Sequence, residues 1–146
     1  NLILCDTCSS HNSSGIHDDQ KKELQNKKEI NNLVKQNVDL TYSIRDSLIK
    51  GDLTKFGNQL DQGWKNKKQF SKKISNKNLD EIYNTAINNG ALGGKLLGAG
   101  GGGFFLFYCD PMRRWNVVKS LNKVNAKVVE FNFETEGLIS WKIRKK

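Results

Sequence analysis

A glycine-rich segment past the middle of the chain constrains its fold more than any other part. Residues 90–103 have the sequence GALGGKLLGAGGGG, in which eight of fourteen residues are glycine. Because glycine loses the most conformational freedom on folding, a domain concentrates it where the backbone needs positive φ or a close approach. Successive backbone amides in such a loop form a concave anion site, chiefly for phosphate. We predict a rigid loop close to a phosphate, with a flexible connector as the alternative.

Two familiar phosphate-binding motifs do not fit this segment. Residues 98–103 satisfy GxGxxG, but a dinucleotide site has a strand before the glycines and a helix after them. Here the hydrophobic pattern predicts the reverse order. A Walker loop is also excluded, because Leu96 follows Lys95 where Ser or Thr is required and Asn89 occupies the first glycine position.

The hydrophobic pattern before the glycine segment predicts one strand and three helices. Residues 2–5 are typical of a buried strand, and apolar residues at helical spacing follow from about 18 to 50. We expect a second helix to begin after Asp52 and a third after Asn78, where Glu81 completes a capping box.

The pattern after the glycine segment adds a strand, a helix and two more strands. Residues 104–109 form a continuous apolar run, and Asp110 and Pro111 have the residue types that open a helix. The apolar side predicted for that helix is Met112, Trp115, Val118 and Leu121. Alternation between residues 129 and 143 predicts two strands joined by a turn. The fold class is therefore α+β, with helices on one face of a small, mostly antiparallel sheet.

The net charge of +9 raises the question of nucleic acid. The densest basic stretch, residues 65–77, contains six lysines and no acidic residue. Only four of the 24 basic residues are Arg, the side chain best suited to base edges and phosphate forks. A basic nucleic-acid-binding module is therefore the alternative from another functional class, and a solvated face is the ordinary interpretation of the stretch.

Cysteine usage favours a reducing cytoplasm, because three cysteines cannot form a closed set of disulfides. Cys5, Cys8, His11 and His17 are of zinc-ligand type, but the Cys pair and the His pair are closer together than in zinc fingers. We expect Cys5 to pack as a small hydrophobe and no metal to bind. No apolar run approaches the ~18 residues of a membrane helix, so no membrane partner is expected.

Residues 95–103, KLLGAGGGG, resemble the third glycine motif of the GHMP small-molecule kinases, K-x-[ST]-G-A-G-x-G-G, with Leu97 in place of Ser or Thr. The longer segment 90–104 is most similar to the D-glycero-D-manno-heptose 7-phosphate kinase branch. The resemblance implies that residues 1–146 form one ferredoxin-like C-terminal domain. It also implies an ATP-dependent kinase that phosphorylates a sugar's anomeric hydroxyl, in lipopolysaccharide or capsule precursor synthesis. Fucose or galactose kinases are alternatives.

The resemblance also implies which residues approach the ligands. The phosphate- and substrate-proximal loop would comprise Lys95, Gly98, Ala99, Gly100, Gly101, Gly102 and Gly103. Lys67 and Lys68 are the candidate contacts to a sugar phosphate. In the family, the N-terminal half carries the main phosphate loop, the catalytic carboxylate and the Mg²⁺ ligand, and no segment here resembles it. We therefore expect no catalytic residue in this chain, ATP and Mg²⁺ bound through that N-terminal partner half, and no activity from residues 1–146 alone.

Overall fold

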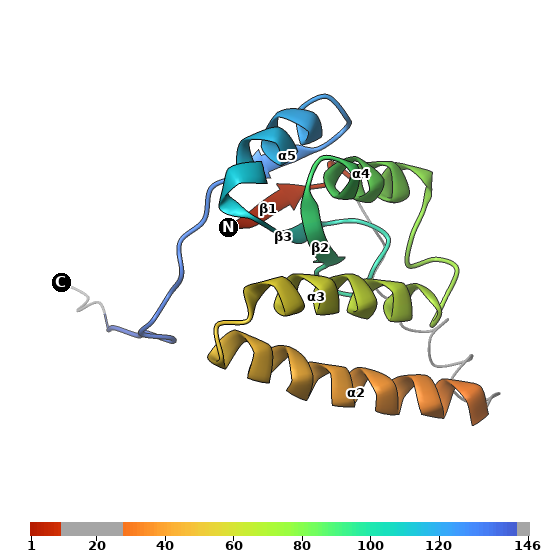
Figure 1. Ribbon diagram of the computed structural model, residues 1–146. Helices are drawn as coiled ribbons and strands as arrows, with labels where there is room; N and C mark the ends of the chain where they lie inside the picture. Colours follow the sequence, from red (N-terminus) through yellow and green to blue (C-terminus); the bar gives the residue numbers. More distant parts are fainter. Residues whose placement is uncertain (10–27, 143–146) are drawn as a thin grey trace.

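A four-stranded antiparallel sheet organises the chain, in a computed structural model that describes residues 1–9 and 28–142 (Figure 1). The strand order is β2-β3-β1-β4, so the first strand of the chain lies inside the sheet. The strands are β1 (Leu2–Asp6), β2 (Ala91–Leu96), β3 (Phe104–Cys109) and β4 (Lys127–Val129). The sheet register pairs Leu2 with Tyr108 and Asp6 with Phe104.

Helices account for most of the remaining described residues. They are α2 (Lys28–Ile49), α3 (Leu53–Lys68), α4 (Lys77–Asn88) and α5 (Arg114–Leu121), with a short 3-10 turn, η1 (Pro111–Arg113). The helix α3 packs along β2, α2 packs on the outer side of α3, and α4 packs beside α5 (Figure 1). None of the helices in the described ranges is long and apolar enough to cross a bilayer.

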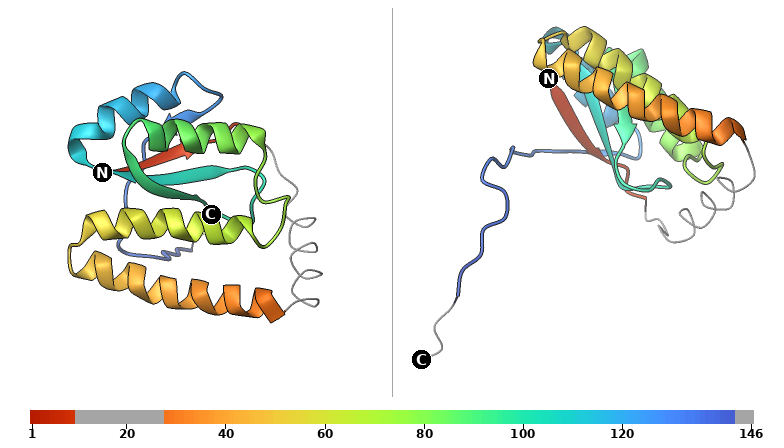
Figure 2. Two further views of the ribbon diagram at one scale, coloured as in Figure 1. Left: turned by 45° about the vertical axis from the view of Figure 1, so that its right-hand side comes forward. Right: turned by 90° about the horizontal axis from the view of Figure 1, so that it is seen from below.

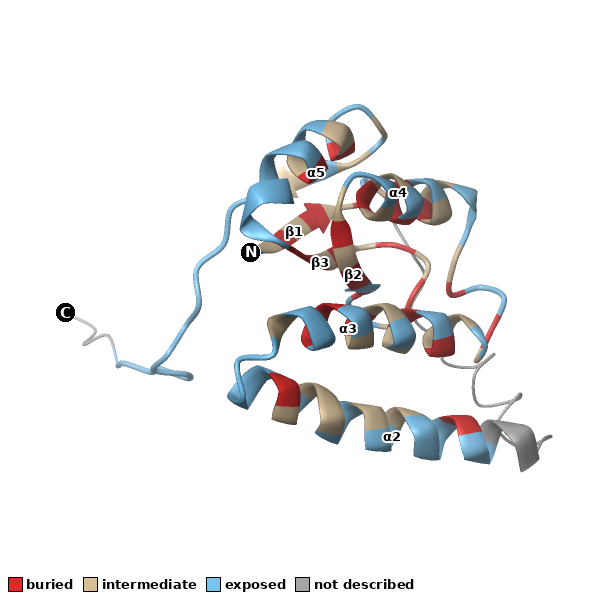
Figure 3. Ribbon diagram, viewed as in Figure 1, coloured by how far each residue is buried: buried red, intermediate tan, exposed pale blue. Residues whose placement is uncertain are grey.

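The core lies between the helices and one face of the sheet (Figure 3). Alternate residues of β1 and β3 point into it, among them the fully buried Cys5, Phe105 and Phe107. Trp64 of α3 meets the Phe105 ring edge-on, with 5.3 Å between ring centroids. Tyr83 of α4 packs on the rings of Phe105 and Phe107. The predicted α+β class, with helices on one face of an antiparallel sheet, is confirmed.

The first part of the glycine segment is a strand, which corrects the prediction of one continuous loop. Residues 91–96 form β2, paired antiparallel with β3. A Cβ at Gly93 would overlap the carbonyl oxygen of Gly57 in α3 and lie 2.8 Å from the amide nitrogen of Asp61. A Cβ at Gly94 would overlap the Phe107 ring. These glycines therefore let a strand approach a helix and a ring closely, and the loop itself is limited to residues 97–103.

The structure confirms one predicted helix cap and corrects another. Asp52 caps α3 as predicted. The cap of α4 is Asn76, whose side chain accepts a hydrogen bond from the Leu79 amide at 3.0 Å, so the prediction of Asn78 was wrong. The Asn78 carboxamide instead donates to the Thr7 carbonyl, and a side chain engaged with the end of β1 cannot close a capping box.

The region after β3 differs from the prediction in its apolar side and its last strands. Asp110 caps η1, and α5 buries Val117 and Leu121, but Met112 is 87% and Trp115 66% exposed. Only β4 forms, and residues 130–142 have no regular structure and extend away from the sheet (Figure 2). No strand in the described residues is hydrogen-bonded to this segment, so its alternating pattern is not expressed as a hairpin. Ile143 lies outside the described residues.

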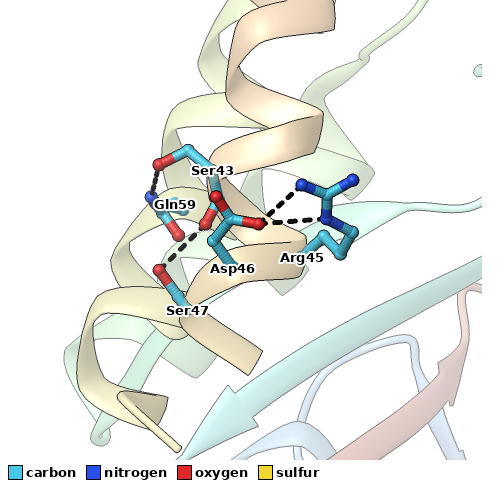
Figure 4. Close-up of polar contacts among 5 residues, drawn as sticks. All are labelled: Ser43, Arg45, Asp46, Ser47 and Gln59. Atoms are coloured by element: carbon cyan, nitrogen blue, oxygen red, sulfur yellow. Dashed lines mark hydrogen bonds and ion pairs between the residues drawn. The ribbon is translucent and has the colours of Figure 1, made fainter. Parts of the chain in front are cut away.

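The α2–α3 pair is joined by side-chain hydrogen bonds (Figure 4). Gln59 of α3 donates from Nε2 to the Ser43 hydroxyl of α2 at 2.6 Å. Ser47 donates back along α2 to the Ser43 carbonyl at 3.0 Å. Gly51, with φ of +72°, ends α2 as predicted, whereas residues 18–27 of the expected first helix lie outside the described part.

Candidate functional site

The loop of residues 97–103 is anchored along its length. The Leu97 amide donates to β3 at 2.8 Å, and the Gly101 amide donates to the Ile74 carbonyl at 2.9 Å. The Gly103 carbonyl accepts from the Thr7 amide at 2.9 Å, which ties the loop to the end of β1. Ala99 packs against the hydrophobic core. These contacts fix the path of the backbone at both ends and in the middle.

The backbone of this loop requires glycine at several positions. The φ angles of Gly98, Gly100, Gly101 and Gly103 lie between +76° and +133°, where L side chains are rarely found. At Gly102 the φ angle is ordinary, but a Cβ would lie 2.5 Å from the carbonyl oxygen of Ser9. Conformation and crowding together explain why the sequence concentrates glycine here.

Three consecutive backbone amides of the loop have no acceptor within the described part of the chain. This holds for Gly98, Ala99 and Gly100, whereas Gly101 and Leu97 are engaged. Consecutive amides of this kind, on a backbone that alternates into positive φ, form a concave donor set suited to phosphate oxygens. The geometry can therefore hold an anion without a side chain.

Polar groups from two other elements border the loop. Asn76 at the start of α4 donates to the Gly101 carbonyl at 3.5 Å, and Asn78 donates to the Ser9 hydroxyl at 3.0 Å. The Thr7 hydroxyl is buried and has no hydrogen-bond partner among the described residues. Sequence reasoning missed these residues, because only the fold brings positions 7–9 and 76–78 to the glycines.

Lys67 is directed at the base of the loop. Its ammonium group donates to the Leu96 carbonyl at 3.2 Å and to the Gly98 carbonyl. Burial lowers the pKa of Lys67 to about 8, and the nearby charge of Lys95 contributes in the same direction. Lys95 itself is exposed, on β2. Lys67 is therefore a half-buried contact of the loop and not part of a solvated face.

Lys68 has a different environment from its neighbour. Its ammonium group lies 3.5 Å from the Asp80 carboxylate and over the Trp64 ring. Lys65, in the same basic stretch, forms an ion pair with Asp61 at 2.6 Å. The structure thus separates the two lysines that the sequence predicted together.

We expect Lys95→Gln to raise the pKa of Lys67, because removing a like charge favours the ammonium form. The pKa of Lys67 can be followed by NMR through its side-chain resonances, with Lys65→Gln as a control that removes one charge elsewhere. An unchanged pKa in Lys95→Gln would contradict the coupling. The pKa of Lys67 in the folded chain, about 8, is lower than its ordinary value of 10.5. Between about pH 8 and 10.5 the unfolded chain therefore binds more protons than the folded chain, and the free energy of unfolding rises with pH across that window.

The described residues offer groups that could bind phosphate but no set of side chains that could bind a metal ion. In residues 1–9 and 28–142, no group of three or more His, Cys, Asp or Glu side chains could hold a metal. Cys5 is buried in the core, as predicted, and burial raises its pKa to about 12. Cys8 is exposed, and His11 and His17 lie outside the described residues. The loop amides fit phosphate oxygens, whereas the described side chains provide no set of Mg²⁺ ligands.

Comparison with known proteins gives consistent matches. Residues 44–127 match the model of the family GHMP kinases C terminal. A D-glycero-alpha-D-manno-heptose 7-phosphate kinase of Campylobacter jejuni is 34% identical over 97% of this chain, and the chain spans 41% of that relative's length.

Two solved structures extend the comparison. A D-glycero-D-manno-heptose 1-phosphate kinase from Bacteroides thetaiotaomicron is 28% identical, with a TM-score of 0.60 over 99% of this chain and 36% of its own. The mevalonate kinase of L. major, in complex with R-mevalonate, is 26% identical, with a TM-score of 0.75 over 84% of this chain and 37% of its own.

Proposed function

Because the chain belongs to the GHMP kinase C-terminal family, we propose that it is the C-terminal half of an ATP-dependent sugar kinase. The proposed acceptor is D-glycero-D-manno-heptose 7-phosphate, phosphorylated on its anomeric hydroxyl. The observation that carries the proposal is the 34% identity with a heptose 7-phosphate kinase along 97% of the chain. In this proposal residues 1–146 are one domain, and an N-terminal half of the same enzyme completes the site.

The role proposed for the loop follows from the chemistry of phosphoryl transfer. That reaction depends on positioning the phosphoryl group and on neutralising its charge, with little covalent work for the protein. The amides of Gly98, Ala99 and Gly100 would donate to a phosphate oxygen, and Lys67 would hold the loop through the Gly98 carbonyl. Lys95 would add positive charge nearby. Mg²⁺ would supply further charge neutralisation, from ligands in the N-terminal half.

We also propose that the enzyme is cytoplasmic. Cys5, Cys8 and Cys109 are free thiols, and all three lie within the described residues. Free thiols are the usual state in a reducing compartment, where sugar phosphates and ATP are also available.

We expect the isolated 146-residue chain to transfer no phosphate from ATP·Mg²⁺, and the intact enzyme to convert the heptose 7-phosphate to a bisphosphate. Product formation by mass spectrometry, over a panel that includes fucose and galactose, measures both. Turnover by the isolated chain, abolished by a substitution within it, would contradict the division of labour. A preference for fucose or galactose would replace the proposed acceptor.

A further inference from the structure

A cavity lies between α2, α3 and β2, and the proposed function assigns no ligand to it. Its volume is about 190 Å³, which exceeds the space of a single water molecule several times over. Its polar side chains come from all three elements: Asn37 and Thr41 from α2, Lys67 from α3 and Lys95 from β2. Leu40 and Phe70 contribute apolar walls. The cavity thus combines cationic, hydroxyl and apolar surfaces.

The two lysines give this cavity a positive charge without a described counter-ion. Neither Lys67 nor Lys95 forms an ion pair with a carboxylate of the described residues, whereas Lys65 and Lys68 are each paired. The charge of Lys95 lowers the pKa of Lys67, so the two ammonium groups repel one another. A dianion bound between them would remove this repulsion, since an opposite charge favours the charged form of each lysine.

The cavity also presents groups with hydrogen-bonding capacity to spare. The Lys67 ammonium has three N–H donors, and the carbonyls of Leu96 and Gly98 accept two of them. The Thr41 hydroxyl donates to the Asn37 carbonyl at 2.8 Å, so its oxygen can accept from a ligand hydroxyl. One cavity therefore offers a donor for an anion and an acceptor for a neutral hydroxyl.

We propose that this cavity binds the phosphate ester of the sugar-phosphate acceptor. Lys67 and Lys95 would contact the phosphate, and Thr41 would contact a sugar hydroxyl. The inference rests on the proposed function, because it takes the acceptor to be phosphorylated. It replaces the pair Lys67–Lys68 indicated by the sequence, since Lys68 is engaged with Asp80. The bond from Lys67 to the Gly98 carbonyl places this subsite directly beside the glycine loop of residues 97–103.

The test is binding of D-mannose 6-phosphate to the 146-residue chain, followed by NMR chemical shifts, with D-mannose as the unphosphorylated probe. We expect shifts at Thr41, Lys67 and Lys95 with the phosphate ester only. Lys67→Gln combined with Lys95→Gln should weaken binding by at least about tenfold, since losing even one charge-assisted hydrogen bond has about that effect. The control combines Lys65→Gln with Lys72→Gln, which removes the same charge from residues outside the cavity and should leave the affinity unchanged. Lys95→Gln alone changes an exposed side chain and should leave the fold intact, so weaker binding by this variant is not the result of a folding defect.

Three results would overturn the subsite. Equal weakening in both double variants would assign binding to net charge, and equal binding of D-mannose would remove the role of the phosphate. Shifts confined to residues 98–103 would place the anion on the loop instead. Failure of the intact enzyme to phosphorylate sugars, with the cavity shifts present, would overturn the proposed function and leave the binding site in place.

Discussion

Gly93→Ala is expected to destabilise the folded chain by about 4 kcal/mol or more, among the largest effects of a single substitution. The added Cβ would overlap the carbonyl oxygen of Gly57, a backbone atom in α3. A flexible side chain could rotate aside, but here the strand β2 and the helix must separate, and the core between them would open. Urea unfolding of the 146-residue chain measures the loss.

Gly63→Ala is the matched control for this prediction. Gly63 lies in α3, the helix that Gly93 of β2 approaches, and the nearest atom to its added Cβ is at 3.7 Å, an ordinary contact distance. Because alanine favours the helix, this variant should gain up to about 1 kcal/mol. Equal stability of Gly93→Ala and the parent chain would show that β2 does not lie against α3 as described.

Gly98→Ala is expected to lower kcat/KM of the proposed sugar kinase tenfold or more, with a much smaller effect on folding. An added Cβ at Gly98 meets no atom within 4 Å, so it projects into open space beside amides without acceptors among the described residues. If a phosphate occupies that space, the methyl group displaces it, and each ~1.4 kcal/mol of lost transition-state stabilisation is a factor of ten. Steady-state kinetics with the heptose 7-phosphate measures the change.

Alanine variants of two other glycines serve as controls that measure the effect of backbone strain alone. Gly51 and Gly137 have φ of +72° and +73°, close to the +76° of Gly98, and an added Cβ at either also meets nothing. Alanine at all three positions should therefore carry a similar strain of about 1–2 kcal/mol. Only Gly98→Ala should reduce the catalytic rate; parallel kinetics in all three variants would argue against a phosphate at the loop.

Local signals predicted much of the fold. Asp52 as a cap, Gly51 as a stop and the apolar run of β3 are each determined within a few residues, and all three hold in the structure. The strand β2 could not be predicted, because its sequence, ALGGKL, lacks the β-branched and aromatic residues typical of strands. Its strand conformation follows from antiparallel pairing with β3, and its glycines are required by the close approach of Gly57 and Phe107.

Part of the candidate site could also be predicted from the sequence, and part depends on the fold. The glycine loop was evident from composition, and the structure accounts for its glycines by positive φ and crowding. The groups around it, Thr7 and Asn76 among them, depend on the sheet register and on the cap of α4. Lys67 is one of six lysines in its stretch, and its contact with the Gly98 carbonyl is a tertiary feature that no local pattern indicates. Whether these residues contact ligands stays a prediction.

Because β1 lies inside the sheet, the sheet cannot close until most of the domain has been synthesised. Leu2 pairs with Tyr108, so β1 leaves the ribosome long before its partner strand exists. The helices α2 and α3 are local and can pair early, whereas closing the sheet requires contacts of high sequence separation, which form slowly. Apolar residues of β1 stay uncovered during that interval, when aggregation competes with folding.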